Sequence, residues 1–265
     1  MHVSQINVYP IKSLKGITVD SAVVENRGLQ FDRRWMLVDE NRKFLTQREL
    51  PTMATISIVV REDSLEVEHE GRRLEIPGQP TVAGRNVSVW TSSVKAAFYS
   101  SEIDDWFSNV LGIKCQLAVM TATSKRPVNP FYAVRKFKDE VSFADGYPFL
   151  IANEASLDDL NDRLGSPVPM NRFRPNFVIT GAPALAEDEW KKIRIGSTLF
   201  HVVKSCERCV ITTVDQASGT KTGPEPLRTL ASYRTKRGKV LFGRYLIVDT
   251  PGSTIRVRDP IDVVA

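Results

Sequence analysis

The sequence predicts a strand-rich α+β protein with barrel-like β-domains and only a few helices. Short segments of alternating apolar and polar residues follow one another closely through the first hundred residues, which is typical of barrels and sandwiches rather than of parallel β-α-β units. The 265 residues allow one large domain or two smaller ones. Hydrophobic residues make up 42% and charged residues 25%, which excludes disordered and fibrous classes. No apolar run approaches the roughly 18 residues that a membrane-spanning helix needs.

The first expected strands form hairpins. Residues 34–39 and 43–47 flank the polar turn Asp39-Glu40-Asn41-Arg42, and this arrangement predicts two paired strands. Further along the chain, apolar residues alternate with polar ones as in half-exposed strands. The apolar positions of this pattern are Leu65, Val67, Leu74, Ile76, Val87 and Val89.

Few helices are expected. Residues 101–111 carry an apolar stripe at helical spacing, with Ser101 as the cap, Asp104 three residues on, and Gly112 as the stop. A second helix is predicted over 154–164, and a short third one begins near Pro226. The remaining expected strands cover residues 177–180, 193–195, 199–203, 210–214, 245–248 and 254–258. We expect a soft boundary near Gly112 that divides the chain into domains of residues 1–112 and 113–265.

The positive charge is concentrated in one segment, although the formal net charge of the whole chain is only +5. Five basic residues without an acid lie between Thr121 and Lys138, interleaved with Phe131, Tyr132 and Phe137. Such a segment is a solvated loop, an anion-collecting loop over an active site, or a nucleic-acid strip. We favour the solvated loop and do not expect nucleic acid as a partner. The basic residues are Lys125, Arg126, Arg135, Lys136 and Lys138.

Cysteine usage and the N-terminus bear on the compartment. Three cysteines are too few for a disulfide framework, and the N-terminus shows no secretory signal. We therefore expect a cytoplasmic protein without a membrane partner.

The sequence gives little support to two large groups of proteins: enzymes with a catalytic or zinc-binding histidine, and nucleotide-binding folds with a glycine-rich loop. The sequence contains three histidines, of which only His201 is placed to serve in a Ser-His-Asp or zinc site. Neither G-x-x-x-x-G-K-[ST] nor G-x-G-x-x-G occurs, so phosphate-loop and dinucleotide folds are not indicated.

The most informative short motif is Cys206-Glu207-Arg208-Cys209, between two expected strands. Its spacing is compatible with reduced structural cysteines, a redox pair, or a zinc knuckle completed by Cys115 and His201. It is also compatible with one thiolate that ligates a redox metal while Arg208 lowers the thiol pKa. The β-branched residues after Cys209 argue against a redox pair, which usually begins a helix. Spacing alone leaves these alternatives open.

Two further clusters favour an anionic ligand. If residues 172–176 are extended, Arg172, Arg174 and Asn176 share one side of the strand. There they can recognise a planar anion or form ordinary surface salt bridges. The motifs Y-P-I-K-S-L-K-G and F-D-R-R-W place Lys or Arg beside irregular backbone, as a phosphate site requires. Each signal is weak alone.

Taken together, the motifs resemble those of MOSC-domain proteins, which are named after the C-terminal domain of molybdenum cofactor sulfurase. The similarity is greatest to bacterial relatives of the mitochondrial amidoxime-reducing component. It runs from Y-P-I-K-S-L-K-G and F-D-R-R-W through T-Q-R-E-L-P, F-A-D-G-Y-P-F-L-I-A-N-E-A-S-L and N-R-F-R-P-N. It continues with E-D-x-W-K-x-I-R-I-G, C-x-R-C-x-x-T-T-V-D, E-P-L-R-T-L-x-S-Y-R and L-F-G-R-Y. The resemblance implies an N-terminal MOSC β-barrel domain, a MOSC domain, and a molybdenum cofactor between them.

The resemblance also implies roles for individual residues. Cys209 would be the thiolate ligand of a molybdenum held by one molybdopterin dithiolene, Cys206 would be a neighbour only, and Asp145 would lie near the metal. The phosphate end of this Mo-molybdopterin cofactor would be held by Lys12, Ser13 and Arg33. The pterin would be lined by Arg174, Asn176, Arg208, the backbone of Glu207 and Tyr245.

The implied activity is two-electron reduction of N-hydroxylated bases, hydroxylamines and amidoximes. Some relatives carry a C-terminal ferredoxin-like domain, but this chain ends at Ala265 and its three cysteines cannot hold a [2Fe–2S] cluster. We therefore expect electrons from a separate flavin reductase, ferredoxin or cytochrome, and we expect no membrane-targeting N-terminus.

Other functions are compatible with the same residues. One alternative is a sulfur carrier with a persulfide on Cys209, and another is a cofactor-binding protein without turnover. Pyridoxal phosphate is linked to some MOSC proteins, but no residue here marks a Schiff-base lysine.

Overall fold

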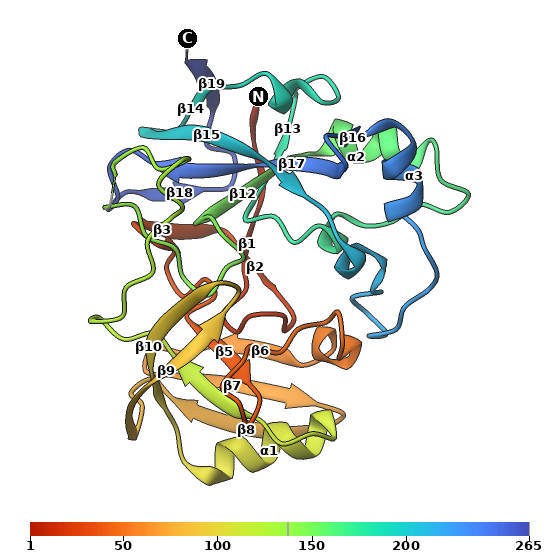
Figure 1. Cartoon of the computed structure of the whole chain (residues 1–265). Helices are drawn as coiled ribbons and strands as arrows, with labels where there is room; N and C mark the ends of the chain where they lie inside the picture. The colour runs from red at the N-terminus through yellow and green to blue at the C-terminus, as the bar shows by residue number, and fades with distance from the viewer. Residues whose placement is uncertain (137, 265) are drawn as a thin grey trace.

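The computed structural model describes residues 1–136 and 138–264 and places one large sheet above a group of smaller sheets (Figure 1). The two ends of the chain lie near each other at the top of the view, where the backbone N–H of Ile261 donates to the carbonyl of Met1 over 3.0 Å. Strands predominate and helices are few, which confirms the predicted strand-rich α+β class.

The large sheet forms the upper part of the molecule. Its strands are antiparallel neighbours except for the parallel pair β12 and β13, so the fold is not a series of parallel β-α-β units. In spatial order they are β19 (Ile261–Val264), β14 (Lys192–Ile195), β15 (Thr198–Glu207), β17 (Lys239–Val248), β12 (Phe149–Asn153), β13 (Phe177–Thr180), β1 (His2–Val8) and β2 (Ile17–Val19), with β16 (Thr235–Lys236) beside β17. A small sheet of β18 (Thr254–Arg256), β3 (Ser21–Glu25) and β4 (Gly28–Leu29) lies next to it.

The lower part contains two antiparallel sheets that share one apolar core with helix α1 (Ser101–Leu111). In β7 the predicted alternation is confirmed, because Leu65 and Val67 are buried and their neighbours are partly exposed. One sheet has the order β5 (Trp35–Val38), β11 (Gln116–Val119), β10 (Ser92–Phe98) and β9 (Val82–Val89); the other has β6 (Ser57–Val60), β7 (Ser64–His69) and β8 (Arg72–Pro77).

Strand pairing crosses the expected boundary near Gly112. The N-terminal strands β1 and β2 belong to the upper sheet, whereas β11 lies beyond Gly112 in sequence and pairs with β5 and β10 in the lower part. The chain therefore passes between the two parts several times. The division into residues 1–112 and 113–265 stays a prediction.

The helices form where the sequence predicts them, with differences at their ends. Helix α1 begins one residue after Ser100, which makes no side-chain capping bond, so the predicted cap at Ser101 is wrong. The Asp104 carboxylate instead accepts the N–H of Leu117 and ties the helix to β11. Helix α2 (Glu154–Asn161) is capped by the Asn153 side chain and is shorter than predicted. Helix α3 (Leu227–Tyr233) directly follows Pro226.

Two expected strands are absent from the part of the chain that the structure describes. Residues 210–213 form the 3-10 helix η4 (Val210–Thr213) instead of a strand. The Thr212 hydroxyl donates to the carbonyl of Cys209, and the Thr213 hydroxyl donates to that of Val210. These local bonds compete with a sheet ladder. Residues 43–47 form only two isolated bridges, from Phe44 to Val38 and from Lys43 to Ser88.

The other expected strands are present, although the one at 254–258 ends at Arg256, whose N–H is accepted by the Asp259 carboxylate. The further 3-10 helices are η1 (Pro51–Ala54), η2 (Met170–Arg172) and η3 (Ala186–Asp188). Across residues 1–136 and 138–264, no helix combines the length and the apolar character needed to cross a membrane.

Candidate functional site

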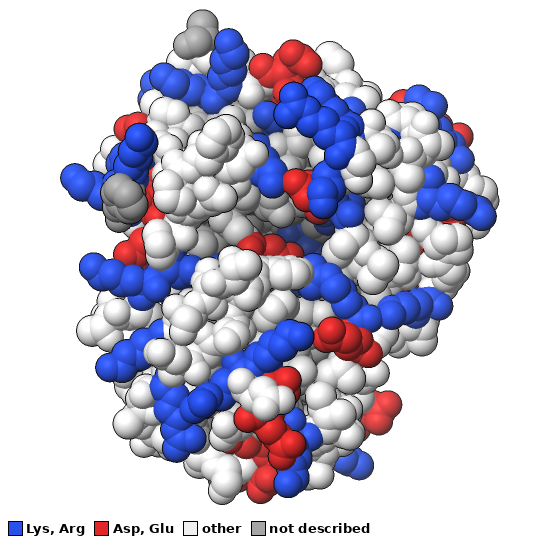
Figure 2. All heavy atoms as spheres, in the orientation of Figure 1, with Lys and Arg blue, Asp and Glu red and all other residues white. Residues whose placement is uncertain are grey.

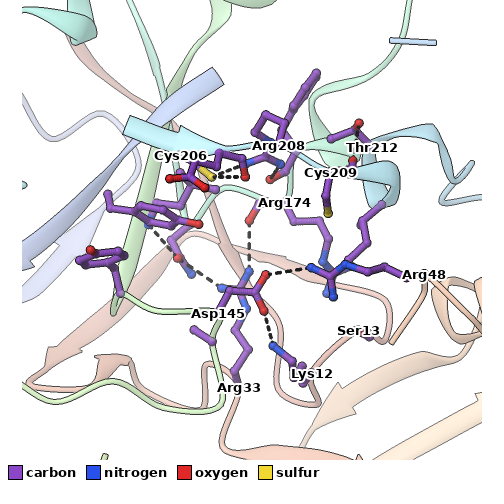
Figure 3. Close-up of a pocket in the computed structure, with 18 residues that line it drawn as sticks. Lys12, Ser13, Arg33, Arg48, Asp145, Arg174, Cys206, Arg208, Cys209 and Thr212 are labelled. Atoms are coloured by element: carbon purple, nitrogen blue, oxygen red, sulfur yellow. Dashed lines mark hydrogen bonds and ion pairs between the residues drawn. The ribbon is translucent and has the colours of Figure 1, made fainter. Parts of the chain in front are cut away.

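The expected site residues meet between the upper and lower parts of the molecule. They surround a cavity of about 100 Å³ whose walls come from loops after β1, before β12 and before β13, and from the end of β15 (Figure 3). The sequence-predicted residues that line it are Lys12, Ser13, Arg33, Asp145, Arg174, Asn176, Glu207, Arg208, Cys209 and Tyr245.

Backbone conformation shapes the floor of the cavity. Ser13, Arg33 and Arg174 have φ angles of 67°, 49° and 54°, which non-glycine residues adopt at a cost of order 1–3 kcal/mol each. Long-range hydrogen bonds hold two of these turns in place: the N–H of Lys12 donates to the carbonyl of Trp35 (2.8 Å), and that of Arg33 donates to the carbonyl of Tyr9 (2.8 Å). The strained turns therefore belong to a fixed frame that directs side chains into one cavity.

Lys12 and Asp145 form the central ion pair. The Lys12 Nζ donates to the Asp145 Oδ1 over 2.5 Å and to the carbonyl of Phe143 over 2.9 Å. Burial lowers the pKa of Lys12 to about 8, although Asp145 opposes this change. Burial raises the pKa of Asp145, but Lys12 and Arg48 outweigh it and hold that pKa below its usual value. At neutral pH this pair is ionised, so Asp145 carries no proton and Lys12 still holds its own.

Arg33 and Arg174 are two half-buried cations that lie close together. Both guanidinium carbons lie 4.2 Å from the centre of the Tyr9 ring. The fully buried Asp32 accepts two bonds from Arg33, at 2.9 and 2.7 Å. Arg174 has no carboxylate partner of this kind among the described residues and donates instead to the carbonyl of Leu14 and to Gln216. Burial lowers the pKa of Arg174 to about 10.

The two cysteines of the C-x-x-C motif have different environments. The Cys206 thiol is buried and accepts a bond from the Arg208 Nη1 over 2.7 Å. Burial raises the pKa of Cys206, and Arg208 offsets this only in part. The half-buried Cys209 thiol points into the cavity in Figure 3. The sequence analysis expects Arg208 to lower the pKa of the metal-binding thiol. This expectation needs one correction, because the thiol that accepts a hydrogen bond from Arg208 is that of Cys206 and not that of Cys209.

The alternatives drawn from cysteine spacing lose support. Cys115 contacts Ser108 in the lower core, and His201 bonds to Asp249 at the end of β17, so neither joins the motif as a zinc knuckle requires. Within residues 1–136 and 138–264, no group of three or more His, Cys, Asp or Glu side chains could hold a metal. Cys206 is the penultimate residue of β15 and Cys209 precedes a short 3-10 helix, unlike a redox pair at the start of an α-helix.

One expected arrangement is wrong. Residues 172–176 are not a continuous extended segment, because Arg172 ends the 3-10 helix η2 and Arg174 has a positive φ. Arg172 donates to Asp215 over 2.8 Å and does not line the cavity, whereas Arg174 and Asn176 do.

Sequence reasoning missed several wall residues. Arg48 contacts Asp145 at 3.6 Å and lies over the Trp90 ring at 4.7 Å. Thr212 and Tyr147 also line the cavity. Arg48 belongs to T-Q-R-E-L-P and Thr212 to C-x-R-C-x-x-T-T-V-D, so those motifs contained the signal for both.

The basic segment between Thr121 and Lys138 is only partly solvated. Arg126 is buried and donates to the carbonyls of Ser142, Ala144 and Asp145, so it fixes the loop that carries Asp145. Arg135 is half-buried and pairs with the buried Asp139 at 2.8 Å. Lys125, Lys136 and Lys138 are exposed. Phe137 lies outside the described residues.

The cavity opens into a larger groove of about 730 Å³. Cys209, Asp145, Arg48 and Tyr147 line both spaces, while Trp90 lies on the wall of the groove. This volume lies in the range that small organic ligands occupy. The Cys209 thiol is therefore placed between an inner cationic cavity and an outer groove.

The charges around the inner cavity favour an anion. Five cationic side chains line it, against the carboxylates of Asp145 and Glu207, and Glu207 is already paired with Lys204 at 2.8 Å. The Arg208 Nε is buried without a hydrogen-bond partner in the described structure. Buried donors without partners are costly, so a ligand with acceptor atoms fits this wall. The cations are Lys12, Arg33, Arg48, Arg174 and Arg208.

Two family models together match most of the chain. The model of the MOSC N-terminal beta barrel domain matches residues 1–114, and that of the MOSC domain matches residues 138–262. The chain is 35% identical to mitochondrial amidoxime-reducing component 1 of Mus musculus, with 98% of this chain and 81% of that protein aligned. The corresponding human protein is 34% identical, with 98% and 82% aligned. Molybdenum cofactor sulfurase of Oryza sativa subsp. japonica is 34% identical, with 92% of this chain but only 32% of the sulfurase aligned.

Proposed function

This chain belongs to the MOSC-domain family that includes the mitochondrial amidoxime-reducing components, and on that premise we propose that it is a molybdenum-cofactor-dependent reductase of N-hydroxylated compounds. The observation that carries the proposal is the Cys209 thiol, which points into a cavity lined by five cationic side chains. A thiolate is a soft ligand of the kind that suits a redox metal. The surrounding cations suit the phosphate of a pterin cofactor.

The residues present fit such a cofactor. Lys12, Arg48 and Arg208 retain donor capacity toward the cavity, and the Arg208 Nε has no partner in the described structure. Arg33 is committed to Asp32, so it would support the phosphate end by holding Arg174 and Asn176 in place. Cys209 would be the metal ligand, with Ser13, Arg174, Asn176, Glu207 and Tyr245 around the pterin and phosphate.

When bound, the cofactor supplies a two-electron reduction in which N–OH, two electrons and two protons give N–H and water. The chain itself contributes charge and protons. Asp145 is held ionised by Lys12 and Arg48 and is therefore an acceptor at neutral pH. Lys12 Nζ, with a pKa of about 8, is the group in the cavity best suited to give up a proton near neutral pH. Tyr147 and Trp90 flank the groove through which a substrate would enter.

The test combines metal analysis with turnover. Freshly purified protein should contain molybdenum and should reduce an amidoxime such as benzamidoxime with reduced methyl viologen as the electron source. Cys209→Ala should abolish this turnover. Protein that binds molybdenum and fails to reduce any N-hydroxylated base would instead be a cofactor-binding protein, and protein with no molybdenum would contradict the proposal.

One observation favours a second candidate. The half-buried Cys209 thiol faces an open groove, so it could also carry a persulfide, and a relative named as a molybdenum cofactor sulfurase matches 92% of this chain. A sulfur carrier would release sulfur from Cys209 as thiocyanate on treatment with cyanide. The reductase proposal expects no such protein-bound sulfur.

A further inference from the structure

Two exposed aromatic side chains, Phe131 and Trp90, lie at or directly beside the groove. Phe131 is 84% exposed, far more than any other large apolar residue in the described part of the chain. Trp90 (47%) lies on the groove wall, whereas Val210 (43%) lines a separate surface pocket next to α3 and Val263 (48%) lies on the edge strand β19. Single exposed apolar residues are common, but Phe131 directly follows Pro130 of the groove wall, so Phe131 and Trp90 place two exposed aromatic side chains at the rim of the groove.

Aromatic rings connect Phe131 with the cavity wall. The centre of the Phe131 ring lies 4.9 Å from that of Tyr132, which lies 5.9 Å from that of Tyr147. Tyr147 stacks on Tyr245 with 4.6 Å between their centres. Tyr245 lines the inner cavity. An unbroken series of packed side chains therefore leads from the surface to the candidate redox site.

The segment that carries Phe131 is held firmly although it has little regular secondary structure. The buried Asp139 carboxylate accepts the backbone N–H groups of Val134 and Arg135, both at 2.7 Å. The N–H of Val128 donates to the carbonyl of Asp139 over 2.9 Å. Together with the buried Arg126, these bonds present Phe131 on a fixed support, and this is not a free loop.

Positive charge surrounds the same region. Lys125, Lys136 and Lys138 are exposed on the segment, and Lys204 lies 5.3 Å from the Tyr132 ring centre. Lys239 lines the groove nearby. Figure 2 shows Lys and Arg side chains around the hollow between the two parts of the molecule and beside the loop at the left of the upper part. An apolar centre with a charged rim is the usual anatomy of a transient protein interface.

We propose that Phe131 with Lys125, Lys136 and Lys138, here named the carrier face, docks an acidic one-electron carrier protein. This inference rests on the proposed reductase function, for which the carrier supplies two electrons in two successive encounters. Phe131 anchors the partner, the lysines attract its carboxylates, and the packed rings bring the carrier close to the cavity. Complementary charge chiefly raises the association rate and weakens as salt screens it.

The test measures binding directly. The full-length protein is titrated with an acidic [2Fe–2S] ferredoxin, and the Kd is measured at low and high salt without any substrate. Phe131→Ala should weaken binding about tenfold. Lys125→Glu/Lys136→Glu/Lys138→Glu should weaken it at least tenfold and should reduce its salt dependence. The matched control is Arg72→Glu/Arg73→Glu/Lys114→Glu, whose side chains are exposed on β8 and after α1 at the far end of the lower part.

The outcomes separate this proposal from the proposed function. The rate of amidoxime reduction with reduced methyl viologen should stay within about twofold of the wild-type rate in every carrier-face variant. Methyl viologen is a small reductant that does not need to dock on the carrier face. If carrier-face and control variants bind ferredoxin equally, the docking proposal is overturned. Tight binding of a single-stranded oligonucleotide that disappears in the lysine variant would also overturn it. Suppose that ferredoxin binding depends on the carrier face but the protein shows no turnover driven by methyl viologen. That result would support the docking proposal and contradict the reductase function.

Discussion

The two cysteines of the C-x-x-C motif should respond to replacement in opposite ways. Cys206 is buried and accepts a bond from Arg208, whose Nε already lacks a partner in the described structure. Cys206→Ala removes that acceptor, and a buried donor without a partner costs about 1–3 kcal/mol. At about 2–4 °C per kcal/mol for a chain of this size, the melting temperature should fall by roughly 2–12 °C.

Cys209 should behave differently, because its half-buried thiol points into the cavity. We expect Cys209→Ala to change the free energy of unfolding by no more than about 0.5 kcal/mol. It should nevertheless abolish amidoxime reduction and lower the molybdenum content. Cys206→Ala should keep the metal and much of the activity, since it removes a neighbour of the metal ligand and not the ligand.

The assay is molybdenum content, turnover and thermal unfolding of both variants, purified side by side. Cys206→Ser is the matched control, because its hydroxyl can still accept a bond from Arg208 and should recover part of the lost stability. Suppose that Cys206→Ala and Cys209→Ala lose metal to the same degree and that Cys206→Ser does not recover it. The single-thiolate reasoning would then be refuted, and the interpretations in which both cysteines act together would be favoured.

Three further predictions follow from the charges in the cavity. Lys12→Ala should weaken cofactor retention by roughly 10–150-fold, the equivalent of one charge-assisted bond, measured as molybdenum per chain after dialysis; unchanged content would remove Lys12 from the site. Asp32→Ala leaves Arg33, whose side chain is 12% exposed, without its carboxylate and should cost about 3–5 kcal/mol in urea unfolding, whereas a loss below about 1 kcal/mol would contradict that pairing. Because Asp145 has a lowered pKa, its ion pairs stabilise the fold above about pH 4 and this stabilisation is lost as the pH falls through that lowered pKa. Asp145→Asn should therefore flatten the fall of melting temperature below about pH 4, and a slope equal to the wild-type one would count against it.

The sequence predicted which residues line the candidate cavity better than it predicted what each one contacts. Motifs identified Lys12, Arg33 and Cys209, which indeed line one cavity. They could not show that Arg33 turns back onto the adjacent Asp32, because this needs the positive φ of Arg33 and the buried position of Asp32. Side-chain pairing in a site depends on tertiary contacts that have no sequence period.

Local propensity failed for a related reason. A run of β-branched residues after Cys209 predicts a strand, but threonine hydroxyls in η4 satisfy nearby carbonyls and allow a tight turn. Because Cys209 directly precedes this turn and is not part of a strand, its thiol points into the cavity. The segment that departs from its propensity is thus the one that carries the candidate ligand, as is common at functional sites.

The pairing of β1 with β13 assembles the cationic floor before any ligand binds. It brings Tyr9 against Pro175, with the Tyr9 hydroxyl donating to that carbonyl over 3.2 Å, and Arg33 and Arg174 then stack on the Tyr9 ring. Asp32 compensates one of these two cations only, and burial lowers the pKa of Arg174 to about 10. Holding the second cation without a carboxylate costs stability that a bound anion would return. Pyrophosphate should therefore raise the melting temperature according to its occupancy, more than chloride does at equal ionic strength. The rise should be smaller in Lys12→Ala, and an equal rise with both salts would show that the cavity does not select phosphate.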